Sequence, residues 1–223
     1  MDLVARETQQ YCMDHKMKLN PKKCKEMFVN IMTNPNILSR DLVVNGTQIE
    51  SVDAYKLLGV MLGSNLKWNT QVDDKTKKAC KRLYALRVLK KAGLQERELV
   101  LVYKSMIRPI LEYAVEAWSD FPEYLSDKLE RVQKRALWII YPGSDYGEAL
   151  KISKLESLKD RRVDLCKKYI NKLKDPSRTL HHLTKTYYTN THGYNLRSGN
   201  QNQIGVRKIR TDRCKKFLTY RYK

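Results

Sequence analysis

The spacing of apolar residues changes at about residue 69, and this change limits the folds open to the chain. Before it, short apolar runs alternate with polar residues, and Asn45-Gly46 lies between two such runs. That dipeptide is the preferred centre of a type I′ β-hairpin. From Asn69 onward, apolar residues recur every three or four positions, as they do on one face of a helix. The sequence therefore predicts an α+β fold that is mainly α, with a small antiparallel sheet followed by a helical bundle.

The predicted elements follow from these two periods. Helices are expected over residues 2–17, 70–91, 95–118, 122–141 and 155–173, with a kink at Pro109 in the second of the later helices. Strands are expected over 24–33, 41–50 and 54–62, and residues 185–223 read as an irregular basic tail. We expect four regions, namely 1–68, 69–142, 143–184 and 185–223.

Positive charge is concentrated in the helical part. The formal net charge is +20, yet residues 1–68 carry nine Lys or Arg against seven Asp or Glu. No acidic residue occurs between Lys75 and Lys91, so no i,i+4 ion pair supports that helix. A basic face of this kind predicts contact with the phosphate backbone of a nucleic acid, through Lys75, Lys78, Arg82 and Arg87. The alternative is a charged face that simply contacts solvent.

The cysteines and the start of the sequence bear on the compartment. Five cysteines lie at long spacings, and the first residues lack the apolar core of a secretory signal. No apolar run approaches the length of a membrane span. We therefore expect an intracellular protein with free thiols and no membrane partner.

Several stretches together carry a family resemblance. They are MKLNPKKCKEM at 17–27, YKLLGVMLGSNLKW at 55–68, KACKRLYALRVLKKAG at 78–93, VYKSMIRPILEYAVEAW at 102–118, LERVQKRAL, LKDRR, and the tail segments YNLRSGN and IRTDRCKKF. In this order they resemble the C-terminal part of a non-LTR retrotransposon (LINE-type, jockey-like) reverse transcriptase, an RNA-directed DNA polymerase. The resemblance implies a palm remnant over 1–68, a helical thumb over 69–142 and a C-terminal extension, in the nucleus and cytoplasm.

The resemblance also implies roles for individual residues. Lys23 falls where the family has a motif lysine, which could act as a general acid near the triphosphate; the alternative is a solvated turn lysine. Residues Tyr55, Lys56, Leu57, Leu58, Gly59 and Val60 would form the primer grip, and Lys22 and Lys25 would add basic contacts. The implied partners are an RNA template, an RNA–DNA or DNA duplex, and the missing fingers and palm of the polymerase.

The catalytic aspartates of that family would lie upstream of the first matching motif. The pair Asp73-Asp74 stands at the start of a Lys-rich helix, where acidic residues favour the helix dipole. The resemblance therefore implies a chain that is inactive alone, with Mg²⁺ and its ligands only in the intact enzyme. The alternatives are a stand-alone basic helical RNA- or DNA-binding protein and a non-functional product of a decayed element.

Aromatic and metal-ligating residues give weaker predictions. Trp68, Trp118 and Trp138 are interpreted as core residues and not as base-stacking platforms. The tail tyrosines could stack on single-stranded RNA; they are Tyr187, Tyr188, Tyr194, Tyr220 and Tyr222. The spacing of His181, His182, His192 and Cys214 matches no zinc pattern, so no metal site is expected.

Overall fold

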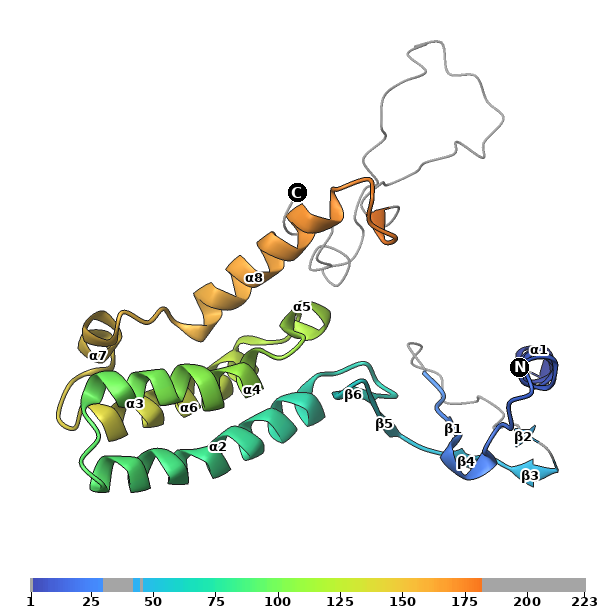
Figure 1. Ribbon diagram of the computed structural model, residues 1–223, viewed down its shortest axis with the longest axis horizontal. Helices are drawn as coiled ribbons and strands as arrows, with labels where there is room; N and C mark the ends of the chain where they lie inside the picture. The colour runs from blue at the N-terminus through green and yellow to red at the C-terminus, as the bar shows by residue number, and fades with distance from the viewer. Residues whose placement is uncertain (1, 30–41, 45, 182–223) are drawn as a thin grey trace, which may run out of the picture. The chain divides into compact units, whose positions relative to one another are not determined.

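The computed structural model describes residues 2–29, 42–44 and 46–181 of the 223-residue chain (Figure 1). The chain divides into two compact units, Met1–Lys77 and Lys78–Lys223. Helices dominate the described part, and the strands are short. The predicted α+β class that is mainly α is therefore confirmed.

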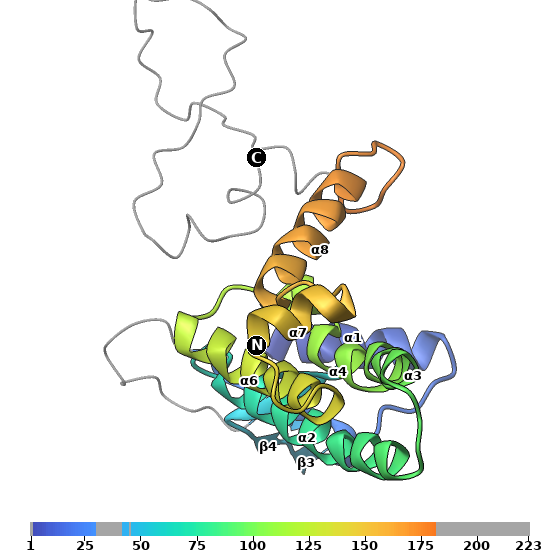
Figure 2. The ribbon, with the colours of Figure 1, turned by 90° about the vertical axis from the view of Figure 1, so that its left-hand side faces the viewer.

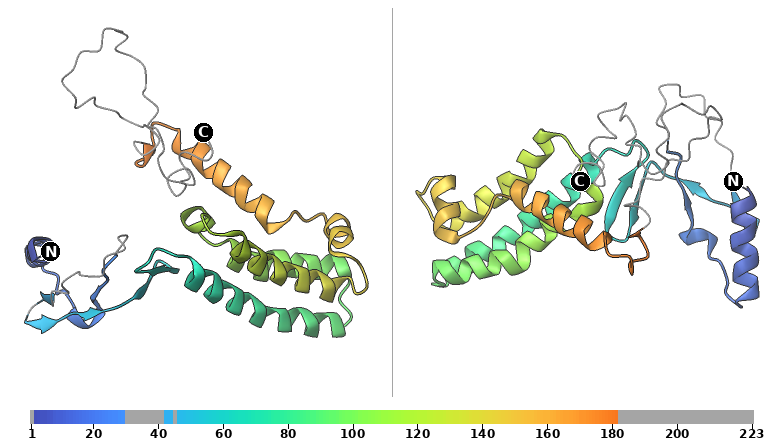
Figure 3. Two further views of the ribbon diagram at one scale, coloured as in Figure 1. Left: turned by 180° about the vertical axis from the view of Figure 1, so that it is seen from behind. Right: turned by 90° about the horizontal axis from the view of Figure 1, so that it is seen from above.

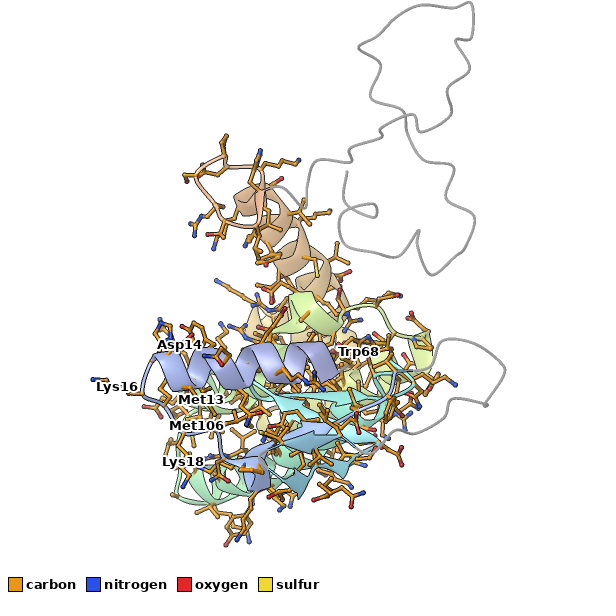
Figure 4. The ribbon with its side chains drawn as sticks, turned by 90° about the vertical axis from the view of Figure 1, so that its right-hand side faces the viewer. Met13, Asp14, Lys16, Lys18, Trp68 and Met106 are labelled. Carbon is orange, nitrogen blue, oxygen red and sulfur yellow. The ribbon has the colours of Figure 1, made fainter. Side chains whose placement is uncertain are left out.

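The described residues of the first unit form the helix α1 (Asp2–Asp14), a short 3-10 turn, η1 (Pro21–Lys23), and several short strands. Met13, Asp14 and Lys16 extend from the end of α1 (Figure 4). The strands are β1 (Lys25–Glu26), β2 (Val43–Val44), β3 (Thr47–Gln48), β4 (Glu50–Ser51), β5 (Ala54–Leu57) and β6 (Val60–Gly63). The first turns of α2 (Asn69–Lys91) complete this unit.

The strands form three separate two-stranded ladders. β2 pairs with β3 and β5 with β6, both antiparallel, as predicted. β1 pairs with β4 in parallel, with Lys25 opposite Glu50, so the prediction of a purely antiparallel sheet is wrong at this pair. The long segment between β1 and β4 is what permits a parallel pairing, since two-residue turns can join only antiparallel strands.

Two turns of the first unit lie at glycines with positive φ. The turn at Gly46 was predicted, whereas the turn at Gly59 divides residues 54–62 into β5 and β6, so the prediction of one strand there is wrong. Gly46 has φ 73° between β2 and β3, which confirms the predicted hairpin; its neighbour Asn45 lies outside the described residues. Between β5 and β6, Leu58 has φ 47° and Gly59 has φ 84°. Two consecutive left-handed residues define a type I′ turn, and a leucine is strained there. The side chain of Leu58 is 85% exposed.

The start of α2 holds the β5–β6 hairpin. The Oε1 of Gln71 accepts a hydrogen bond from the Met61 amide at 2.9 Å, and the ammonium of Lys75 donates to the Gly59 carbonyl at 3.2 Å. Gln71 and Lys75 are both buried. Lys75 is therefore a structural residue of the first unit.

We expect Leu58→Gly to stabilise the hairpin by about 1 kcal/mol, because glycine adopts the left-handed conformation without strain. Val60 pairs with Leu57 across the turn. Slower hydrogen exchange of the Val60 amide would therefore report this gain in stability. Leu57→Gly is the control, because Leu57 does not have a positive φ, and glycine should destabilise the strand there. Equal effects of the two substitutions would contradict the strain at Leu58.

The described residues of the second unit are mainly helical (Figures 1 and 2). After the later turns of α2 come α3 (Glu96–Val102), the π-helical segment η2 (Tyr103–Ile107), α4 (Arg108–Glu112), α5 (Val115–Trp118), α6 (Glu123–Ile140), α7 (Tyr146–Ser153) and α8 (Leu158–Leu173). α6 contacts α3, α7 and α8, and α5 contacts α8 (Figure 3). The predicted helices over 70–91, 122–141 and 155–173 are confirmed with small shifts at their ends.

The predicted helix over 95–118 is not continuous. Pro109 lacks an amide hydrogen, and its ring would clash with the carbonyl four residues earlier in a regular helix. The π segment directly before it relieves this clash, and the Arg108 amide bonds to the carbonyl of Tyr103, five residues back. Ala114, with φ 52°, then breaks the helix before α5.

The sequence reading missed α7. Its N-cap is Asp145, whose Oδ2 accepts a hydrogen bond from the Gly147 amide at 3.0 Å. Asp145 followed by Glu148 three residues later is a helix-start signal that the sequence contained.

The polar centre of the second unit is Gln133 on α6, which is fully buried. Its Oε1 accepts a hydrogen bond from the hydroxyl of Tyr103 at 2.5 Å. Its Nε2 donates to the Tyr146 hydroxyl and to the Glu156 carbonyl, both at 3.0 Å. One side chain of α6 thus links η2, α7 and the loop before α8.

Glu130, one helical turn earlier, extends this network. Its carboxylate accepts a hydrogen bond from the Tyr146 hydroxyl and another from the Leu158 amide, at 3.1 Å to Oε2. The Leu158 amide is among the first of α8, which have no partner within the helix, so Glu130 satisfies a donor there. Arg161 of α8 forms a two-pronged ion pair with Glu112 of α4.

We expect Gln133→Ala to destabilise the second unit by about 2–4 kcal/mol, because it leaves buried polar groups unpartnered and opens a cavity. Urea unfolding followed by far-ultraviolet circular dichroism measures the change. Arg131→Ala, on the exposed side of the same helix, should change stability by less than about 0.5 kcal/mol. A Gln133→Ala change as small as that control would show that the network does not hold the unit together.

Alkaline pH should weaken this unit. Burial, with Glu112 nearby, raises the pKa of Tyr103, and burial together with the hydrogen bond to Glu130 raises the pKa of Tyr146. Unfolded phenols ionise near pH 10. The two tyrosines therefore contribute stability that is present below about pH 10 and lost as the pH rises above it.

The urea midpoint should accordingly fall between pH 9 and pH 11. Tyr103→Phe starts from a lower stability, since it removes the hydrogen bond to Gln133, but its further fall should be smaller because one raised pKa is gone. Loss of lysine charge at high pH affects the parent protein and Tyr103→Phe alike. The difference between their falls in urea midpoint therefore reports ionisation of the Tyr103 phenol. The same fall in both proteins would contradict the assignment.

Candidate nucleic-acid interface

The later turns of α2 have one apolar and one basic side. Ala79, Leu83 and Leu86 are buried. Lys81, Arg82, Arg87 and Lys91 are exposed. Within the part of the chain that the structure describes, none of these four forms an ion pair. The helix therefore presents positive charge that no described residue pairs with.

The four residues predicted on this helix do not share one face. Lys75 is buried on the hairpin, as described above, and Lys78 and Arg82 are exposed one turn apart. Arg87 is five positions after Arg82, which places the two about 140° apart around a helix of 3.6 residues per turn.

Lys81, which the prediction omitted, lies three residues after Lys78 and is exposed with it. Helical spacing already indicated this neighbour. The exposed aromatic residue Tyr84 follows one turn later.

Lys90 differs from the other lysines of α2. Its ammonium donates hydrogen bonds to the carbonyls of Ile139 and Ile140, the latter at 3.0 Å. These carbonyls end α6, where a positive charge is favourable. Lys90 therefore joins α2 to α6 and is not available to a ligand.

The other predicted contacts belong to the first unit. Lys22 and Lys23 are exposed in η1, where the Asn20 side chain accepts a hydrogen bond from the Lys22 amide at 3.1 Å. Lys25 forms an ion pair with Glu50 across the β1–β4 ladder.

The predicted primer-grip residues surround the β5–β6 turn. Leu57 and Leu58 are exposed at the hairpin tip, as are Tyr55 and Lys56 on β5, whereas Val60 is buried. The positions of these residues give no separate support for nucleic-acid binding by the hairpin.

A second exposed basic surface lies on α6, and it contains a tryptophan. Trp118 is fully buried, as predicted, but Trp138 is 67% exposed, so its interpretation as a core residue is wrong. Trp138 is two positions from the buried residues Ala136 and Ile140, which turns it about 200° away from them. Arg131, Lys134 and Arg135 are exposed on the same helix.

A pocket of about 250 Å³ adjoins this surface. Trp138, Lys134 and Arg135 line it from α6, and Ser144, Tyr146 and Ala149 line it from the following loop and α7, together with Leu137. The ammonium of Lys134 lies 5.0 Å from the centre of the Tyr146 ring, within cation–π range.

The described residues offer no metal site: no three of their His, Cys, Asp or Glu side chains are placed to hold an ion. His181 is hydrogen-bonded through Nδ1 to the Leu173 carbonyl at 3.0 Å. The tail tyrosines, His182, His192 and Cys214 lie outside the described residues, as does the predicted basic tail over 185–223. None of the helices described is long and apolar enough to cross a membrane.

Comparison with known protein families gives a match over part of the chain. Residues 68–108 match the family described as alkylated DNA repair protein alkB homolog 8, N-terminal. The matched segment runs from Trp68 through α2 and α3 to the end of η2 and the first residue of α4. Neither the curated proteins nor the solved structures contain a match to the chain.

This match contradicts the resemblance to a retrotransposon reverse transcriptase. The stretch KACKRLYALRVLKKAG, quoted for the polymerase thumb, lies inside the segment that matches the other family. The polymerase-fragment function is wrong with it, and the palm and thumb assignments have no support. Short basic amphipathic helices have similar sequences in unrelated proteins, because burial on one face and solvent on the other impose the same pattern.

Proposed function

We propose that the helical unit binds nucleic acid, holding the phosphate backbone through the basic side of α2. The observation that carries this proposal is the set of exposed basic residues Lys81, Arg82, Arg87 and Lys91 on a stretch of chain without any acidic residue. A charged face that only contacts solvent usually mixes both signs, since opposite charges support the helix at i,i+4 spacing.

The nature of the contact follows from the side chains. Lysine and arginine neutralise phosphates and release counterions, which gives affinity without reading the base sequence. Because Ala79, Leu83 and Leu86 are buried, a phosphate backbone can reach this helix only from its exposed basic side. The family description of the matched segment, which refers to DNA repair, supports a nucleic-acid partner.

The salt dependence of binding tests this proposal. We expect the purified full chain to bind a fluorescein-labelled 20-base-pair duplex, with log K falling linearly with log salt concentration. Lys81→Gln with Arg82→Gln should reduce the magnitude of that slope by about one to two, because each lost phosphate contact removes about 0.9. Fluorescence anisotropy between 50 and 400 mM salt provides the measurement.

Lys167→Gln with Lys168→Gln is the matched control. These two residues are exposed on α8, and their replacement removes the same net charge. The control should keep the original slope. Equal slope changes in the two double variants would show that net charge alone drives binding, and would overturn the assignment to α2.

A further inference from the structure

The pocket beside Trp138 has a combination of three features that is not found on the basic side of α2. A large aromatic ring is exposed at 67%, two cationic side chains, Lys134 and Arg135, line the same pocket, and none of the described acidic side chains lines it. An exposed tryptophan is unusual on a helix whose other face is so well buried, because a ring of this size dominates the energetics of a core when it is buried. Its position on the outside therefore points to a partner.

The size of the pocket limits the ligand. Its volume of about 250 Å³ is below the range of roughly 300–1,000 Å³ for pockets that hold drug-sized ligands. A single planar ring system suits this space better than a folded peptide does. The indole of Trp138 can stack on such a ring, since base–aromatic stacking accepts any base.

Tyr146, which lines the pocket, is held by hydrogen bonds. The hydroxyl of Tyr146 donates to Glu130 and accepts from Gln133 at 3.0 Å, so its ring is fixed from the buried side. That ring in turn lies under the ammonium of Lys134. The cation is thereby held at the pocket, where it can meet a phosphate without the full entropic cost of ordering a free lysine.

We propose that this pocket binds one unstacked base of a single-stranded nucleic acid, with Trp138 stacked on the base and Lys134 and Arg135 on its flanking phosphates. A nucleotide carries its base and its phosphate close together. The pocket likewise presents Trp138 and the two cationic side chains on successive turns of one helix. Arg131, one turn further along the exposed side of α6, extends the basic path for the neighbouring phosphate. A duplex keeps its bases stacked, so the pocket distinguishes single strands from duplexes. This inference deepens the proposed function and rests on it.

Intrinsic fluorescence tests the stacking directly. Trp118 is fully buried, and Trp68→Phe removes the half-buried tryptophan, which leaves Trp138 as the exposed emitter. In that background we expect oligo(dT) of ten nucleotides to quench the emission and to shield Trp138 from acrylamide. Trp138→Ala should lower the affinity for this oligonucleotide about tenfold and leave the affinity for the duplex within about twofold. Trp138→Phe should recover part of the loss because it restores an aromatic face.

Leu101→Ala is the control, because Leu101 is also a large exposed apolar residue but lies on α3 and does not line the pocket. It should change neither affinity. Unchanged oligo(dT) binding by Trp138→Ala, while Lys81→Gln with Arg82→Gln still weakens binding, would overturn the pocket and keep the proposed function. Absence of any nucleic-acid binding by the parent chain would overturn both.

A membrane surface is the competing ligand for an exposed tryptophan beside cations. A blue shift of Trp138 emission with vesicles of phosphatidylcholine and phosphatidylserine, without quenching by oligo(dT), would overturn the proposal in favour of that surface. Circular dichroism of each variant should match the parent, since Trp138 is exposed and its replacement removes no buried contact.

Discussion

The buried hydrogen bonds around Gln133 and Glu130 fix the arrangement on which the rest of the second unit depends. Four helical segments and a loop meet at these two side chains of α6. A buried amide and a half-buried carboxylate are costly unless their groups have partners, so alternative packings of α7 and α8 are disfavoured. The main effect of the network is therefore to select one packing arrangement of these helices.

This arrangement has a consequence for the surface. Ala136 and Ile140 of α6 are buried, so Trp138, which is two positions from each, faces outward. Tyr146, which is hydrogen-bonded to Gln133, lines the same pocket as Trp138 and Lys134. Lys90 of α2 donates a hydrogen bond to the last carbonyl of α6 and so joins the basic helix to the helix that contains Gln133.

Periodicity predicted the long helices, because a helix that buries one face repeats its apolar residues every three or four positions, as α2, α6 and α8 do. It failed at the 95–118 segment, where the effect of Pro109 spreads over a π turn, and at Lys75, whose partner Gly59 lies sixteen residues away. Trp138 was misjudged by residue type, although its distance from Ala136 and Ile140 placed it outside. The reverse-transcriptase resemblance is contradicted by the family match over residues 68–108. The helical stretches quoted for it follow a pattern that burial of one helix face imposes on unrelated proteins.

Lysine footprinting of the full chain with oligo(dT) tests the central claim most directly. That claim is that the second unit binds nucleic acid through exposed basic residues of α2 and α6. The account predicts that acetylation of Lys81, Lys91 and Lys134 slows severalfold when the oligonucleotide is present, while Lys167 and Lys168 on α8 keep their reactivity. Lys90, whose ammonium is bonded to the end of α6, should react slowly in both states. Uniform protection of all exposed lysines, or protection confined to α8, would contradict the account.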